Sequence, residues 1–375
     1  MVTVHMPKIG APQVGDTIDA LDTPSIVIDL SAMEENIARL MARLASSGKR
    51  VRPHLKTVKS PHLAKKLLDA GATGCCVAKV SEAEVMAQAG ITDLLITSEV
   101  MGTVKIGRLL NLVSQYPNVK VVVDSTEGAQ ALNSAIDDMA EPIKLQVLIE
   151  LNVGQNRAGV APGTEAVDLA RYIASLENLR LVGIQGYEGH LQHLANDERQ
   201  RLCREAMNKL CDTAKQIRAA GLPLEIVTTG GTGTCEICAQ FDDITEVQPG
   251  SFVFMDVAYR NAIGQLYSNA LSVISTVISR PVAERAIIDA GLKSLSNDMG
   301  NPELKNDSTT SYRPGGDEHG ILTCSANNTT LKIGARVEII PSHIDTTVNL
   351  FDTYYGIRNG IIEEIWPILA RGKVQ

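Results

Sequence analysis

The chain has 375 residues, of which 44% are hydrophobic and 3% aromatic, and a formal net charge of −8 at pH 7. This length and apolar content are enough to bury a large core and are typical of two domains. The negative charge and the scarcity of aromatic residues argue against nucleic acid or an anionic membrane surface as a partner. No apolar stretch reaches the length of a bilayer span and the first residues are unlike a signal peptide, so we expect a cytoplasmic protein.

Short apolar strands alternate with amphipathic helices over the first part of the chain. After an irregular lead-in over 1–22, the sequence predicts a strand at 25–30 and a helix at 31–43. Strands then follow at 51–57, 74–80, 93–99, 120–124, 144–153, 179–187, 225–229 and 245–247. The helices between them are predicted at 61–70, 82–89, 104–116, 126–139, 165–176 and 198–220.

These eight strands are rich in Val, Ile and Leu and show little polar alternation, which indicates a parallel sheet buried on both faces. Their alternation with helices favours an α/β fold of the (β/α)8, TIM-like barrel type. A doubly wound sheet is disfavoured because no Gly-x-Gly-x-x-Gly follows the first strand.

From residue 271 the pattern changes to strands separated by Gly, Asn and Asp turns, with no helix of useful length. These strands are predicted at 271–279, 285–290, 319–324, 336–340, 354–358 and 361–366. We therefore expect an N-terminal segment and strand over 1–30 that packs with a β domain, a barrel over 31–265 and the C-terminal β domain over 266–375.

Seven cysteines stand at irregular spacings. Their odd number, and the position of Cys75 and Cys76 in an apolar run, favour free thiols over a disulfide framework. Cys235 and Cys238 have redox or zinc spacing, but no second cysteine pair accompanies them.

A lysine stands at the end of the first barrel strand. Pro53 favours an extended conformation for Arg52, so His54 and Lys56 are expected on one face of a strand. Barrel enzymes place their sites at the carboxyl ends of strands, where desolvation lowers the pKa of a lysine and its neutral amine can form a Schiff base. Taken alone, Lys56 is more typical of a surface lysine beside Lys59, and it is the later motifs of the chain that favour the site.

A glycine and threonine loop over 230–234 follows a late strand of the barrel. Its backbone amides and the hydroxyls of Thr232 and Thr234 are suited to a phosphate, which barrels commonly bind in this place. A lysine on the first strand opposite a phosphate cradle is the arrangement that pyridoxal phosphate needs. Arg157, in the loop after strand 144–153, is a candidate partner for the phenolic oxygen of the ring.

A second group of candidate residues lies in the β domain. His343 and Asp345, two residues apart, offer two ligands to a divalent cation, although such a pair is also common as a structural contact. In the segment 187–193, either His190 or His193 is a candidate general base if the segment covers the pocket.

Together these residues carry a resemblance that extends from about residue 23 to residue 371. The segments, in order, are TPSIVIDL, RPHLKT, KVSEAE, NVGQNRAGV, GGTGT, QPGSFVFMD, IDAGLKS, DEHG and PSHID…NLFD. They are similar to the metal-activated D-threonine aldolases and D-3-hydroxyaspartate aldolases. That group belongs to the alanine-racemase-like, fold type III pyridoxal phosphate enzymes, which also include eukaryotic-type D-serine dehydratase.

The resemblance implies a site and an assembly. Cofactor contacts are implied for Lys56, Arg157, Tyr187, Thr229, Gly231, Thr232, Gly233 and Ser251. A metal is implied on His343 and Asp345, with Mn²⁺ expected ahead of Mg²⁺, Ca²⁺ or Zn²⁺, and His193 is implied close to the substrate hydroxyl. A homodimer is also implied, with the β domain of one subunit near the barrel mouth of the other.

Some residues depart from the family pattern. Ala78 stands where many relatives carry glutamine, and Glu188 and His190 are unusual in their segment, so we expect them to bear on substrate specificity. Asp345 favours the aldolases, because the dehydratase branch tends to carry a cysteine there as a zinc ligand.

The predicted function is a lyase that depends on pyridoxal phosphate and a divalent metal and cleaves D-3-hydroxyamino acids to glycine and an aldehyde. The alternative within the family is a dehydratase of D-serine or D-threo-3-hydroxyaspartate. A pyridoxal phosphate carrier without turnover is disfavoured by the β domain with its His343 and Asp345 pair. A racemase is disfavoured because the β domain shows no obvious catalytic tyrosine of the racemase kind.

Overall fold

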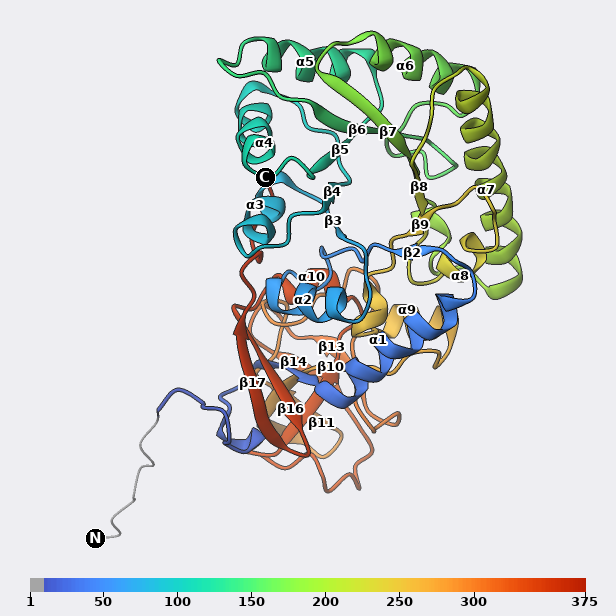
Figure 1. Cartoon of the computed structure of the whole chain (residues 1–375). Helices are drawn as coiled ribbons and strands as arrows, with labels where there is room; N and C mark the ends of the chain where they lie inside the picture. Colours follow the sequence, from blue (N-terminus) through green and yellow to red (C-terminus); the bar gives the residue numbers. More distant parts are fainter. Residues whose placement is uncertain (1–9) are drawn as a thin grey trace.

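The computed structural model describes residues 10–375 and confirms the predicted fold class, a TIM-like barrel followed by an antiparallel sheet domain (Figure 1). The barrel sheet has eight parallel strands in the order β2-β9-β8-β7-β6-β5-β4-β3. Their bounds are β2 (Arg50–Val51), β3 (Cys75–Val77), β4 (Leu94–Ile96), β5 (Lys120–Val123), β6 (Leu145–Glu150), β7 (Leu179–Gly186), β8 (Ile226–Thr229) and β9 (Glu246–Val247).

Helices cover the outside of this sheet, as Figure 1 shows for α4 to α7. The helices of the described chain are α1 (Leu30–Ala45), α2 (Pro61–Asp69), α3 (Val80–Gln88), α4 (Thr103–Gln115), α5 (Thr126–Asp137), α6 (Thr164–Ser175), α7 (Asn196–Ala219), α8 (Cys235–Cys238), α9 (Val257–Ile263) and α10 (Ile344–Val348). Short 3-10 turns occupy Ile18–Ala20, Gly189–Leu191 and Ser251–Val253. No helix in the described part of the chain has the length and apolar character needed to cross a bilayer.

The barrel strands are apolar on both faces because each face is buried. Side chains pointing inward form one cluster, and those pointing outward pack beneath the helices. The inner cluster consists of Cys76, Leu95, Val122, Leu148, Val182 and Ile226. All seven cysteines are free and buried, in agreement with their spacing.

The first barrel strand is shorter than the predicted strand at 51–57 and ends at Val51. Pro53 has no N–H to continue the ladder, although its carbonyl accepts a hydrogen bond of 2.9 Å from the amide of Cys76. His54 pairs with Cys76 in a single parallel bridge, and this contact joins the two ends of the eight-stranded sheet. The chain then turns over residues 55–58, so Lys56 lies on a turn rather than in a strand.

The second sheet has nine strands in the order β11-β14-β13-β12-β15-β10-β1-β16-β17. They are β1 (Ser25–Asp29), β10 (Leu271–Val282), β11 (Arg285–Ile288), β12 (Glu303–Leu304), β13 (Ser311–Pro314), β14 (Gly320–Thr323), β15 (Arg336–Ile340), β16 (Thr353–Arg358) and β17 (Ile361–Pro367). The N-terminal strand β1 lies between β10, to which it is antiparallel, and β16, to which it is parallel.

Two features of this part were not predicted. The strands β12 and β13 are short and polar, so they lack the apolar pattern that identifies a buried strand. Helix α10 begins directly after His343 and has only five residues, too few to give a helical period. In Figure 1, α10 lies between the barrel strands and the second sheet.

Candidate active site

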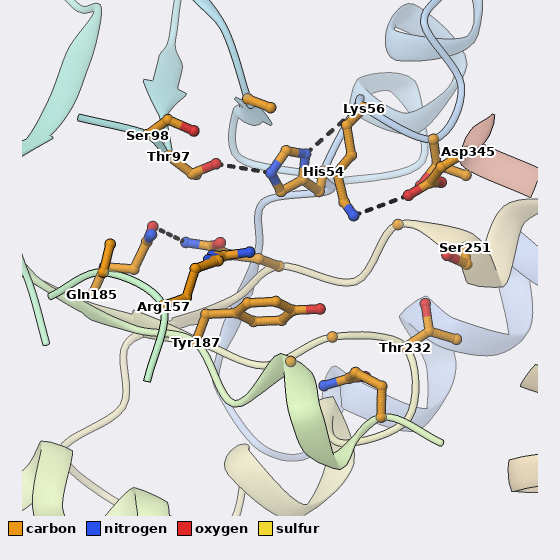
Figure 2. A pocket seen from close by; sticks show the side chains of 18 of the residues that line it. His54, Lys56, Thr97, Ser98, Arg157, Gln185, Tyr187, Thr232, Ser251 and Asp345 are labelled. Atoms are coloured by element: carbon orange, nitrogen blue, oxygen red, sulfur yellow. Dashed lines mark hydrogen bonds and ion pairs between the residues drawn. The ribbon is translucent and has the colours of Figure 1, made fainter. Parts of the chain in front are cut away.

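A cavity of about 460 Å³ opens at the carboxyl ends of the barrel strands, next to the start of α10. It brings together most of the predicted site residues, several of which are labelled in Figure 2. The predicted residues in its lining are Lys56, Arg157, Tyr187, His193, Gly231, Thr232, Ser251, His343 and Asp345. Thr229 and Gly233 lie outside the lining.

The amine of Lys56 points at a carboxylate from the other sheet domain (Figure 2). Its Nζ atom lies 2.9 Å from Oδ2 of Asp345, and this charge raises the pKa of Lys56. The expected lowering of the Lys56 pKa by desolvation is therefore wrong for this structure, because the attraction of the adjacent carboxylate outweighs burial. Burial alone would raise the pKa of Asp345, but Lys56 and His343 hold it below its usual range.

His343 and Asp345 face each other at the start of α10. His343 is the residue before the helix and Asp345 lies in its first turn. The Nε2 atom of His343 is 3.9 Å from Oδ2 of Asp345. The Nδ1 atom of His343 is 2.7 Å from Oδ2 of Asp298. The other oxygen of Asp298, Oδ1, accepts hydrogen bonds from the hydroxyls of Ser296 and Thr346.

This donor set fits a divalent cation. The contact with Asp298 fixes the imidazole of His343 through Nδ1 and leaves Nε2 facing Asp345. The second oxygen of Asp345, Oδ1, is buried and accepts no hydrogen bond from any residue between 10 and 375. The hydroxyl of Thr57 helps to lower the pKa of Asp345, yet this hydroxyl and Oδ1 are both buried without a hydrogen-bond partner among the described residues. A carboxylate oxygen left so, beside an available imidazole nitrogen, is suited to a hard cation.

Of the two candidate bases, only His193 lines the cavity. Its ring stands 4.5 Å from the ring of Tyr259 in α9, and desolvation, with a smaller effect of His343, lowers its pKa. A lowered pKa keeps the imidazole neutral and able to accept a proton near pH 7. His190 instead lies against Gly154, outside the lining.

The glycine and threonine loop packs closely on Gln192. A Cβ atom at Gly233 would come within 2.5 Å of the carbonyl oxygen of Gln192, so only glycine fits there. A Cβ atom at Gly231 would come within 2.6 Å of the end of the Gln192 side chain, which would have to move. The hydroxyl of Thr232 accepts a hydrogen bond from the amide of Phe252, and the loop therefore lies beside the Ser251 turn. The amides of Gly231 and Gly233 already donate within the protein, to Oγ1 of Thr234 at 3.0 Å and to Oε1 of Gln192 at 2.9 Å. The hydroxyl hydrogen of Thr232, at the cavity lining, is therefore the loop donor that suits an anion such as a phosphate.

Two residues have other roles than expected. The hydroxyl of Thr229 points away from the cavity, 2.7 Å from the carbonyl of Gly186 and 2.8 Å from the carboxylate of Glu188. Glu188 is fully buried beneath the loop, where its other oxygen accepts a hydrogen bond of 2.5 Å from Thr234. Glu188 therefore supports the loop from below through the hydroxyls of Thr229 and Thr234, and it is absent from the cavity lining.

Comparisons with known proteins agree with this geometry. A profile of the alanine racemase N-terminal domain matches residues 28–257, and one of a putative serine dehydratase domain matches residues 270–357. The sequence is 36% identical to D-threonine aldolase of an Arthrobacter species, over 96% of this chain and 95% of that one. The crystal structure of D-threonine aldolase from Filomicrobium marinum, also 36% identical, superposes with a TM-score of 0.93 and covers 97% of this chain and 99% of that one.

The chain belongs to the alanine-racemase-like, fold type III family of pyridoxal phosphate enzymes. A further relative, D-threo-3-hydroxyaspartate dehydratase of a Delftia species, is 33% identical over 94% of this chain and 99% of that one. A cysteine variant of that dehydratase has been described in a metal-free form, so metal binding occurs in the family. This protein is therefore an enzyme of that family. Its relatives include aldolases, which are carbon–carbon lyases, and also dehydratases.

Several residues that line the cavity were not predicted from the sequence. At the barrel mouth, Gln185 donates to Glu150 at 2.6 Å and accepts from Gln248 at 2.9 Å, and burial raises the pKa of Glu150 to about 8. Glu150 and Gln185 are polar residues within the last four positions of the predicted strands 144–153 and 179–187, and Gln248 directly follows the predicted strand 245–247, so a signal was available. Tyr259 and Asp298 gave no such signal, since they lie outside the strand ends.

His54 lines the cavity beside Lys56 in a fixed, neutral form. Its Nε2 atom is 2.9 Å from the hydroxyl of Thr97, whose own hydrogen is directed at the carbonyl of Val77 at 3.2 Å. The imidazole therefore donates through Nε2, and its Nδ1 accepts from the amide of Lys56 at 3.3 Å. Burial, aided by the charge of Lys56, lowers the pKa of His54 to about 3.

Arg157 and Tyr187 form the remaining contact among the predicted residues. The guanidinium carbon of Arg157 lies 5.8 Å from the centre of the Tyr187 ring, a cation–π distance. Both side chains face the cavity in Figure 2, and burial raises the pKa of the Tyr187 phenol.

Proposed function

We propose that this enzyme is an aldolase that uses pyridoxal phosphate and a divalent metal to cleave D-3-hydroxyamino acids into glycine and an aldehyde. The observation that carries the proposal is the convergence of Lys56 with His343 and Asp345 in one cavity. The 36% identity between this chain and D-threonine aldolase, over nearly the whole chain, supports the same reaction.

Pyridoxal phosphate would be held through the amine of Lys56. Gly231, Thr232 and Ser251 would face its phosphate, and Arg157 and Tyr187 would face its ring. When bound, pyridoxal phosphate supplies the electron sink for the pair left on Cα by bond cleavage. The amides of both Gly231 and Gly233 would act indirectly, because they donate to Oγ1 of Thr234 and to Oε1 of Gln192 and so support the loop.

A divalent cation would be held by His343 and Asp345, with Asp298 orienting the imidazole. When bound, the cation lowers the pKa of the β-hydroxyl of the substrate. A carboxylate oxygen in place of a thiolate suits Mn²⁺, Mg²⁺ or Ca²⁺ better than Zn²⁺, and the resemblance places Mn²⁺ first among them.

His193 would act as the general base. In its neutral form it takes the proton of the β-hydroxyl, the bond between Cα and Cβ breaks, and the Cβ fragment leaves as an aldehyde. A proton then adds to Cα and glycine leaves. The homodimer and the cytoplasmic location implied by the resemblance and by the composition stay predictions.

The second candidate function is that of a dehydratase. It is supported by the 33% identity between this chain and the Delftia enzyme. In that reaction the α-proton is removed and the hydroxyl is expelled, which gives a keto acid and ammonia. Asp345 favours the aldolase, because the resemblance places a zinc-binding cysteine there in the dehydratase branch.

A product assay separates the two reactions. Purified enzyme with Mn²⁺ is given D-threonine, D-phenylserine, D-serine and D-3-hydroxyaspartate, and aldehyde and ammonia are measured with and without EDTA. We expect aldehyde from at least one substrate and its loss with EDTA. Ammonia and a keto acid as the main products would contradict the proposal.

A further inference from the structure

Arg199, in the first turn of α7, is a buried cation outside the cavity. Its side chain is 5% exposed, and no acidic side chain between residues 10 and 375 pairs with it. Its Nη1 atom donates to the carbonyls of Leu194 at 2.7 Å and Ala262 at 2.9 Å, and Nη2 contacts Asn196 at 3.3 Å. Burying a guanidinium without a counter-charge is costly, so its carbonyl contacts must offset that cost.

The two carbonyls belong to two segments that both carry cavity residues. Leu194 directly follows His193, and Ala262 lies in α9, one turn after Tyr259. The rings of His193 and Tyr259 stand 4.5 Å apart. The guanidinium of Arg199 is therefore hydrogen-bonded both to the residue after His193 and to α9, the helix whose Tyr259 ring packs against the ring of His193.

The other end of α9 is attached to the proposed metal ligands. The amides of Val257 and Ala258 donate to the carbonyls of Pro341 at 3.1 Å and Ser342 at 3.3 Å, which directly precede His343. The buried carboxylate of Asp256 caps α9 and accepts from the amide of Ile344 at 3.1 Å. Helix α9 is thus held against the turn of His343 and Asp345 at one end and bonded to Arg199 at the other.

We propose that Arg199 is a positioning residue that sets the place of His193 relative to the turn of His343 and Asp345. Arg199 acts through the backbone of residue 194 and through α9, and it touches neither substrate nor cofactor. The inference rests on the proposed role of His193 as base. Because a displacement of about 1 Å of a catalytic group costs on the order of 100-fold in rate, a remote residue of this kind is functionally important.

The test compares the holoenzyme with Arg199→Met, which keeps an unbranched apolar stem in place of the arginine stem and removes the guanidinium donors. The matched control is Arg204→Met, since Arg204 lies on the same helix, is exposed and makes one side-chain hydrogen bond, to Gln240. We expect Arg199→Met to lower kcat by about 100-fold while KM and cofactor affinity change little. The control variant is expected to keep the native kcat.

A double-mutant cycle with His193→Ala decides between positioning and general destabilisation. If Arg199 acts through His193, adding Arg199→Met to His193→Ala lowers the residual kcat no further. An equal loss of kcat in both backgrounds would overturn the inference. Should Arg199→Met fail to fold, Arg199→Lys is expected to show a smaller loss with the same dependence on His193.

The cycle also separates this inference from the proposed function. A His193→Ala variant with native turnover would overturn the role of His193 as base, and the inference with it. A slow His193→Ala variant on which Arg199→Met still has its full effect would overturn only the positioning role.

Discussion

The amine of Lys56 lies 2.9 Å from Oδ2 of Asp345. Lys56 follows the first barrel strand, whereas Asp345 lies in the first turn of α10, between β15 and β16. The contact joins the two halves of the cavity and keeps both groups charged. Asp345 meets the amine with Oδ2, while its buried Oδ1 accepts no hydrogen bond from residues 10–375. The two side chains are expected to have separable roles.

The first prediction separates these roles by absorbance and turnover. Lys56→Ala should abolish the band at about 400–430 nm of bound pyridoxal phosphate, because the only proposed covalent anchor is removed. Asp345→Ala should keep that band and lose activity, because it removes a proposed metal ligand. Absorbance spectra and initial rates of both variants check this. Full activity of Asp345→Ala in the presence of a chelator would show that the carboxylate holds no catalytic metal.

The second prediction concerns Asp298, which contacts Nδ1 of His343 at 2.7 Å. Asp298→Asn should weaken Mn²⁺ binding by about 10–100-fold, because the amide orients the imidazole less firmly. Titration of the metal-depleted enzyme with Mn²⁺ gives the affinity directly. The exposed Asp317, changed to Asn, is the control, and equal affinities of the two variants would argue against an orienting role of Asp298.

The third prediction concerns Glu188 beneath the glycine loop. Glu188→Gln should lower the free energy of unfolding by about 2 kcal/mol, because an amide nitrogen replaces one oxygen that accepts hydroxyl hydrogens. Since the loop above it is the proposed phosphate cradle, cofactor affinity should fall as well. Denaturant unfolding and cofactor titration measure both effects, with the exposed Glu198→Gln as control. An unchanged stability would mean that the loop does not depend on this carboxylate.

The fourth prediction follows from the pKa of Glu150, which burial raises from 4.5 to about 8. The folded state holds this proton more tightly than the unfolded state, so the associated stability is full below pH 4.5 and is lost as the pH rises through about 8. Between about pH 5 and pH 9, the native protein should lose a few kcal/mol more stability than Glu150→Gln. Urea unfolding across this range tests it, with Glu165→Gln as control. Parallel curves for native and Glu150→Gln proteins would contradict the shift.

The barrel was predictable because its strands are buried on both faces, which leaves a long run of apolar segments between helices. The same reasoning placed Lys56 and Arg157 at the cavity, since both follow strand ends. The length of the first strand was not predictable, because the bridge from His54 to Cys76 depends on closure of the sheet. Strands β12 and β13 were missed because their pairing comes from neighbours and not from their own composition.

The electrostatics of the site could not be read from the sequence. Burial suggested a lowered pKa for Lys56, but the carboxylate that raises it comes from a distant part of the chain. Glu188 was assigned to the substrate pocket from its segment, whereas the donors of Thr229 and Thr234 hold it below the loop. Asp298 and Arg199 act on His343 and His193 through contacts that only the folded chain creates.

The central claim is that the bond between Cα and Cβ is the one that breaks. D-3-hydroxyaspartate tests it most directly, because relatives of this chain include both an aldolase and a dehydratase of 3-hydroxyaspartate. With Mn²⁺ present, the account predicts glycine and glyoxylate in equal amounts, without ammonia. Oxaloacetate and ammonia in equal amounts, without glycine, would contradict it.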